Sequence, residues 1–150
     1  MIALKKETLK AALLALCGGG LYLLLELLWR GFSHWTMFLL GGGCFALIGL
    51  LNELFPWEMP LLLQGVIGSF GIVTPLEFVT GCVVNLWLGW QVWDYSWMPL
   101  NLLGQVCLPF ALLWVPVAMA AVVLDDLLRW KFFGEERPHY TLLRWKEEKI

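Results

Sequence analysis

The chain has 150 residues, of which 60% are hydrophobic and 15% are charged, and its formal net charge is −2. Average soluble domains are ~45–50% apolar and ~25% charged, so this composition argues against a soluble globular protein. The ten tryptophans agree, because indole prefers the membrane–water boundary, and the few basic residues leave no basic surface for nucleic acid. We therefore predict an all-α, polytopic membrane protein.

Four apolar stretches are candidates for membrane-spanning helices, since about 20 apolar residues cross ~30 Å of hydrocarbon. They cover about 9–29, 35–51, 61–88 and 102–124. The third is long, so we expect it to be tilted or to bend at Gly71 and Pro75, because proline removes a backbone donor. The prediction is a four-helix transmembrane domain over 1–128, followed by a charged cytoplasmic tail over 129–150 with a turn at Gly134.

The start of the chain resembles an export signal. Lys5 and Lys6 precede an apolar run, and residues 14–18 resemble a lipoprotein cleavage box. However, Leu16 stands where a small residue is required, and the apolar stretch continues well past ~15 residues. We expect a first span that is retained.

The basic residues predict the orientation. Nine of the ten lysines and arginines lie outside the apolar region, and Arg30 is the exception. An even number of spans puts both ends on one side, and the positive-inside rule makes that side cytoplasmic. Tryptophans then gather at the outer boundary (Trp29, Trp35, Trp87, Trp90, Trp93 and Trp97) and at the inner one (Trp57, Trp130 and Trp145). We predict both termini in the cytoplasm.

Glycines and cysteines indicate how the spans pack. Glycine triplets at 18–20 and 41–43 would let the first two helices approach closely, and so would Gly65, Gly68 and Gly71 on the third. The four cysteines lie in apolar stretches without a Cys-x-x-Cys pair, so we interpret them as packing residues.

Charged residues near the end of the first span form one candidate site. Glu26 precedes Arg30 by four residues, the favourable order for an ion pair on a helix. The pair is either a snorkelling arginine with its counter-ion or an anion site near the outer mouth. His34 in the next loop is either a hydrogen-bonded anchor or a ligand.

The third span carries a carboxyl at membrane depth. Thr74, Glu77, Gly81 and Asn85 share one helical stripe, and Glu77 lies ~24 Å from the inner end at 1.5 Å per residue. A carboxyl there must be protonated or paired. It is either a hydrogen-bonded anchor to Asn101 or Gln105, or a proton- or cation-linked site.

The loop that follows is rich in aromatic residues around one acid. Trp93, Asp94 and Tyr95 precede Ser96, whose groups could donate to Asp94 in a tight turn. Alternatively, the aromatic rings and the acid form a lid or a cup that accepts a cation. The candidate substrate-binding residues are therefore Glu26, Arg30, His34, Glu77, Asn85, Trp93, Asp94, Tyr95, Asn101 and Gln105.

Catalytic, metal and nucleotide motifs are not found in the sequence. Carboxylates are scattered one per helix without a metal-type histidine spacing, and Asp125 and Asp126 are interpreted as a cap held by Arg129. There is no Walker loop and no Gly-x-Ser-x-Gly motif. We expect no enzyme activity, no cofactor and no metal, and any ATP would have to be used by another chain.

Several motifs resemble the ABC-transporter type IV family, small bacterial membrane proteins that are labelled ABC transporter permeases. They are Arg30-Gly31-x-Ser33-His34-Trp35, Glu77-Phe78-x-Thr80-Gly81, Trp93-Asp94-Tyr95-Ser96, Asn101-x-x-Gly104-Gln105 and Asp125-Asp126. The likeness covers roughly residues 20–140. It implies a multi-pass protein of the bacterial cell membrane that acts in transport with a separate ATP-binding subunit.

Two functions follow from the sequence. The first is a permease-like transporter subunit whose polar site opens outward and uses Glu77 as the charge-coupling carboxyl. The alternative is a non-transporting interaction or assembly protein, in which the polar residues only join helices. Expected partners are membrane lipids, further copies of the chain and an ATP-binding subunit.

Overall fold

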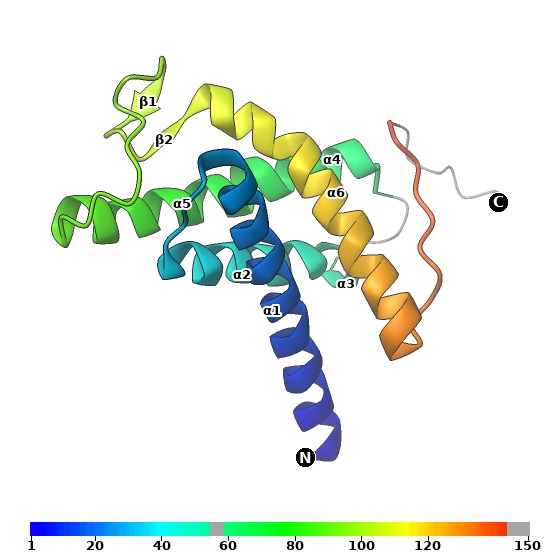
Figure 1. Ribbon diagram of the computed structural model, residues 1–150. Coiled ribbons are helices and arrows are strands. Elements are labelled where there is room, and N and C mark those ends of the chain that lie inside the picture. Colours follow the sequence, from blue (N-terminus) through cyan, green and yellow to red (C-terminus); the bar gives the residue numbers. More distant parts are fainter. Residues whose placement is uncertain (55–58, 144–150) are drawn as a thin grey trace.

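A computed structural model of the protein describes residues 1–54 and 59–143 (Figure 1). Residues 55–58 of the predicted polar turn and the last part of the predicted tail lie outside this range. Within it, three helical segments are long and apolar enough to cross a membrane: Ile2–Arg30, Leu61–Trp87 and Leu108–Phe133. A shorter apolar helix covers Trp35–Gly49. The fold is therefore mainly helical, as predicted.

Helix α1 (Ile2–Arg30) is rich in leucine and alanine, which favour helix formation. It ends where Gly31 adopts a left-handed conformation with φ of 76°, and the Gly31 amide donates to the Leu27 carbonyl. Its first two turns are exposed, and this part of α1 projects away from the other helices (Figure 1).

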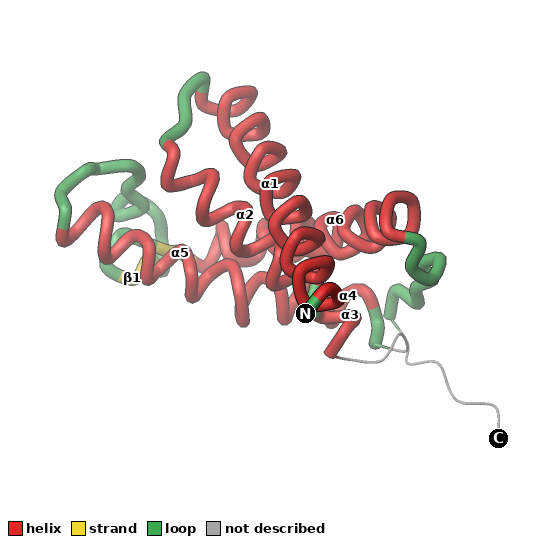
Figure 2. Tube along the Cα trace, turned by 90° about the horizontal axis from the view of Figure 1, so that it is seen from below, coloured by secondary structure: helices red, strands yellow, loops and turns green. Residues whose placement is uncertain are grey.

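Helix α2 (Trp35–Gly49) packs against α1, and the short helix α3 (Leu51–Leu54) follows it. Figure 2 shows α1 and α2 side by side. A Cβ atom at Gly18 would collide with Phe45, and one at Gly41 would collide with Tyr22. The two predicted glycine triplets therefore do provide close contact between the first two helices.

The third segment is one continuous helix that contains two π-helical stretches. It consists of α4 (Leu61–Val66), the π-helical η1 (Ile67–Val73), α5 (Thr74–Gly81) and the π-helical η2 (Cys82–Trp87). Pro75 is the second residue after η1 and has no amide hydrogen to donate, which suits a local departure from α-helical bonding. The sequence predicted a tilt or a bend at Gly71 and Pro75, and the structure has a stretch of wider, π-helical winding that contains Gly71.

A loop and a small hairpin connect the third segment to the last helix. Strands β1 (Asn101–Leu102) and β2 (Val106–Cys107) pair in antiparallel fashion, with Asn101 opposite Cys107. Leu103 and Gly104 between them have φ of 52° and 72°. Such values do not occur in a right-handed helix, so the prediction that the fourth span begins at 102 was wrong.

Helix α6 (Leu108–Phe133) begins with Pro109 in its first turn, a favourable place for proline. It ends at Gly134, where φ is 67°, which confirms the predicted turn. The segment after it returns to α4, and the amides of Leu61 and Leu62 donate to the carbonyls of Thr141 and Leu142. These bonds satisfy donors that the start of a helix would otherwise leave free.

The core lies where α2, the third segment and α6 meet. Ile48, Leu51, Ala118 and Val122 form one buried cluster, and Met37, Val84 and Trp93 form another near the loop. Much of the remaining surface is apolar, with many leucines exposed along α1 and α6. An apolar outer surface is what a helix bundle in lipid requires.

Candidate functional site

Glu77 on α5 is buried between helices, and its side chain is only 3% exposed. One carboxyl oxygen accepts a hydrogen bond of 3.0 Å from the Tyr95 hydroxyl, and the other accepts one of 3.3 Å from the Trp114 indole. None of the ion pairs between described residues involves Glu77. Among the described residues, this buried carboxyl thus has two neutral donors and no cationic partner.

The carboxyl of Glu77 borders a pocket between α1, α2, α5 and α6, with a volume of about 190 Å³. We call it the central pocket. Among its lining residues, polar side-chain atoms come from Tyr22, Cys44, Glu77 and Trp114, and the other side chains are aliphatic or aromatic carbon. The arrangement is an apolar space with one acidic group at its wall.

Aromatic rings hold the donors to Glu77 in place. Tyr95 stacks on Phe110 with ring centroids 4.8 Å apart, and Tyr22 lies against Trp114 at 5.9 Å. Burial and the nearby Glu77 carboxyl raise the pKa of the Tyr95 hydroxyl. The hydroxyl therefore stays protonated and available as a donor.

The predicted partners of Glu77, Asn101 and Gln105, are not its partners in the structure. Both lie in the hairpin region, Asn101 just before the predicted fourth span and Gln105 within it. Gln105 instead accepts a 2.8 Å hydrogen bond from the Asn85 amide, and its backbone carbonyl accepts one of 2.9 Å from the Trp93 indole. Asn85 also accepts from the Val92 amide at 2.7 Å. This network attaches the loop to η2.

Asp94 lies in an exposed turn rather than in the central pocket. Its carboxylate accepts bonds of 2.8 Å and 2.9 Å from the amide and the hydroxyl of Ser96, which confirms the predicted turn. These bonds lower the pKa of Asp94 below its ordinary value. Asn101 donates to the Met98 carbonyl at 2.8 Å and accepts from Gly104 at 3.0 Å, so it also shapes the loop.

The charged residues at the end of α1 form the predicted pair. Arg30 donates from Nε to Glu26 at 2.6 Å, and its guanidinium lies 4.8 Å from the Phe32 ring. His34 caps α2 by accepting from the Thr36 amide, and its ring lies 5.7 Å from that of Trp90. Glu26, Arg30 and His34 therefore all have partners within the protein.

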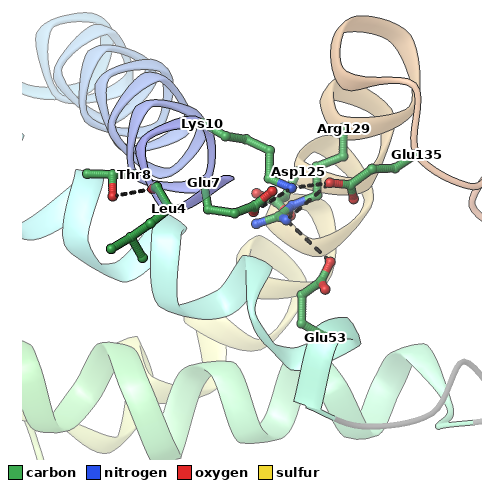
Figure 3. Close-up of polar contacts among 8 residues, drawn as sticks. All are labelled: Leu4, Glu7, Thr8, Lys10, Glu53, Asp125, Arg129 and Glu135. Carbon is green, nitrogen blue, oxygen red and sulfur yellow. Dashed lines mark hydrogen bonds and ion pairs between the residues drawn. The ribbon is translucent and has the colours of Figure 1, made fainter. Parts of the chain in front are cut away.

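A second polar region lies at the opposite end of the helices (Figure 3). Arg129 donates to Asp125 at 2.7 Å and to Glu53 at 3.3 Å, and Lys10 of α1 pairs with Glu135. We call these residues, together with Glu7, the ion-pair cluster. The prediction that Arg129 holds Asp125 is confirmed, whereas Asp126 accepts from the Tyr140 hydroxyl.

Of the ten predicted site residues, Glu77 and Tyr95 come together in the structure. Asn85, Trp93 and Gln105 form a separate group beside them. Sequence reasoning missed Tyr22 and Trp114, which line the central pocket. One feature of the sequence could have indicated Trp114. The other nine tryptophans are predicted to lie at the outer or inner membrane boundary, whereas Trp114 lies inside a predicted span. In the described residues, no group of three or more metal-ligating side chains is found.

The sequence matches one protein family. The family described as Putative ABC-transporter type IV matches residues 21–135, a range that includes Glu77, its two donors and every lining residue of the central pocket except Gly18. Neither a curated protein nor a solved structure matches the chain.

Proposed function

Since the chain belongs to the ABC-transporter type IV family, we propose that it is a permease-like subunit of a membrane transport system. In this proposal Glu77 is the group that contacts the transported molecule. The observation that carries the proposal is a buried carboxyl that borders a pocket and has no cationic partner among the described residues. An ionisable group at membrane depth without such a partner is typical of a functional site.

We infer four membrane crossings with both termini in the cytoplasm of a bacterial cell. The ion pair of Lys10 with Glu135 supports this, because it places the start of α1 and the end of α6 at one end of the bundle. At the other end, His34 and Trp35 lie against Trp90. Helix α2 has 15 residues, and in this proposal it crosses the membrane together with α3, which follows it in the chain.

The energy source in this proposal is a separate ATP-binding subunit, and we assign this chain no catalytic reaction. Self-association is a further part of the proposal. Gly20 and Gly43 support it, because a Cβ atom added at either would meet nothing within 4 Å, so another helix could approach there.

The test compares cells that lack the protein with cells that produce the wild type, Glu77→Gln or Glu136→Gln. Small molecules inside and outside the cells are quantified by mass spectrometry, and the amount of each variant in the membrane is measured. We expect at least one compound whose distribution follows the wild type and Glu136→Gln, but not Glu77→Gln. Glu136 is exposed, so it controls for the loss of one carboxylate.

The second candidate function is a non-transporting interaction protein. It is favoured by the hydrogen bonds of Glu77, since both of its oxygens already accept from the protein. Under that function, no compound changes its distribution when the wild type is produced. Glu77→Gln then changes only the thermal stability of the purified protein.

A further inference from the structure

The chemistry of the central pocket restricts what it can hold. Leu25, Leu40, Phe45, Ile48 and Val73 are among its lining residues, and they offer no hydrogen bonds. An apolar cavity of ~150 Å³ stays dry and binds benzene, and the central pocket is larger, at about 190 Å³. A hydrated ion or a sugar would lose its hydrogen bonds there, at a cost of several kcal/mol for each polar group. The main part of a suitable ligand is therefore hydrocarbon.

The wall at Glu77 adds a second requirement. A carboxylate has about four acceptor positions, and Tyr95 and Trp114 use two of them. On α1, Arg30 is already paired with Glu26, so this arginine has its own counter-charge. The rings of Tyr22 and Trp114 also line the pocket, and aromatic faces attract ammonium groups. The carboxyl and the rings together favour a positively charged nitrogen.

The edge of the pocket indicates the route of access. Leu21 and Leu25 on α1 are 41% and 58% exposed, and Val117 on α6 is 39% exposed, although all three line the pocket. They lie in the second half of α1 and the first half of α6, two helices that are long and apolar enough to span a membrane. The pocket is thus open between α1 and α6, toward the region where lipid chains would lie.

We propose that the central pocket binds an amphiphile with a hydrocarbon chain and an ammonium group, which enters sideways from the bilayer between α1 and α6. The chain occupies the apolar part of the pocket, and the ammonium group contacts Glu77 beside the rings of Tyr22 and Trp114. This inference rests on the proposed function and names the substrate class of the same site.

The experiment uses the full chain in dodecyl maltoside micelles, whose head group is neutral and lacks nitrogen. The probe is a twelve-carbon alkylamine that carries a diazirine at the end of its chain. After illumination, labelled peptides are identified by mass spectrometry. We expect labels on pocket-lining residues of α1, α2 and α6, and excess dodecylamine should prevent this labelling while dodecanol should not.

Two variants locate the binding site. Glu77→Gln removes the charge that holds the ammonium group, and we expect about tenfold less labelling, because a hydrogen bond to a charged group is worth ~1.5–3 kcal/mol. Ala121→Phe fills the pocket and should reduce labelling by a similar factor. Leu113→Phe on the exposed face of the same helix is the matched control and should leave labelling unchanged. Size-exclusion profiles show which variants are folded.

Three results would overturn the inference. Equal competition by dodecanol and dodecylamine would show that the pocket takes neutral lipid. Labelling that neither Glu77→Gln nor Ala121→Phe reduces would show that the probe binds elsewhere. Crosslinks that join two copies through the pocket would show that a second copy fills it. A fourth result separates the two proposals. If the pocket is labelled but no compound in cells depends on Glu77, the proposed transport function is contradicted while the binding site is supported.

Discussion

Glu77 and Asp125 are both buried carboxyls in apolar helices, but their surroundings differ. Asp125 is fully buried and lies 2.7 Å from the Arg129 guanidinium in the ion-pair cluster. Glu77 has hydrogen bonds from Tyr95 and Trp114 and no cation among the described residues. A buried charge that carries its own counter-charge is part of the architecture. A buried charge without a counter-charge is available to a ligand.

Packing around the two acids supports the same distinction. The Asp125 carboxylate lies so close to Gly49 of α2 that a Cβ atom there would collide with it, and Asp125 does not line the central pocket. Glu77 borders that pocket. The region of Asp125 is therefore closed by protein atoms, whereas the region of Glu77 has room for another molecule.

The strongest test of this comparison is Arg129→Met. It leaves Asp125 buried without its cation, and removing one partner of a buried pair costs about 3–5 kcal/mol. We expect the free energy of unfolding, measured in mixed micelles with increasing sodium dodecyl sulfate, to fall by this amount. The double variant with Asp125→Leu should recover most of the loss. A single variant as stable as the wild type would contradict the structural role of the pair.

Gly49→Ala tests the closed packing around Asp125. The added methyl group would displace the carboxylate from α2, and overpacking of this kind costs about 1–3 kcal/mol. The measurement is the same unfolding experiment. Gly43→Ala on the same helix is the control, because nothing lies within 4 Å of the added atom, and it should not destabilise the protein. Equal effects of the two variants would count against the proposed contact.

Glu77→Gln should change stability less than either variant above. The amide keeps the shape of the side chain and an acceptor for Tyr95, while the loss of one hydrogen bond costs about 0.5–1.5 kcal/mol. Removal of a buried charge offsets this cost. We expect a net change within about 1.5 kcal/mol in the unfolding experiment. A loss as large as that of Arg129→Met would make Glu77 a structural anchor.

The smallest effect is expected at Asp94, which is exposed. Its pKa is lowered because the carboxylate accepts from the Ser96 amide and hydroxyl. A lowered pKa means that the turn is stabilised above the ordinary pKa of ~3.9 and loses this support as the pH falls through the lower, folded value. The Ser96 amide resonance should therefore shift at a pH below ~3.9. Asp94→Asn should abolish that shift, and a midpoint above the ordinary value would contradict the hydrogen bonds.

Local features were predicted well from the sequence, because they depend on spacing along one segment. The ion pair of Glu26 with Arg30, the turn at Asp94 and the helix end at Gly134 are examples. Each involves residues at most four positions apart, or a backbone conformation that glycine favours. The glycine contacts of α1 with α2 were also predicted, since lipid-embedded helices approach through small residues.

The start of the last helix was not predicted, because Leu102, Leu103 and Val106 continue the apolar pattern of α6. Hydropathy measures composition and does not detect the positive φ of Leu103 and Gly104. These backbone angles are incompatible with a right-handed helix, so α6 begins only after them. The predicted partners of Glu77 were the amides of Asn101 and Gln105, whereas its donors are Tyr95 and Trp114. Trp114 reads as an apolar residue in a hydropathy pattern because its ring is mostly hydrocarbon. Its indole N–H nevertheless donates a hydrogen bond to Glu77.

The bonds from the start of α4 to residues 141 and 142 have a consequence for biosynthesis. The amides of Leu61 and Leu62 obtain these carbonyl partners only after the ribosome has synthesised that distant segment. The hydrogen-bond pairing at this end of the third segment must therefore wait until translation has passed residue 142.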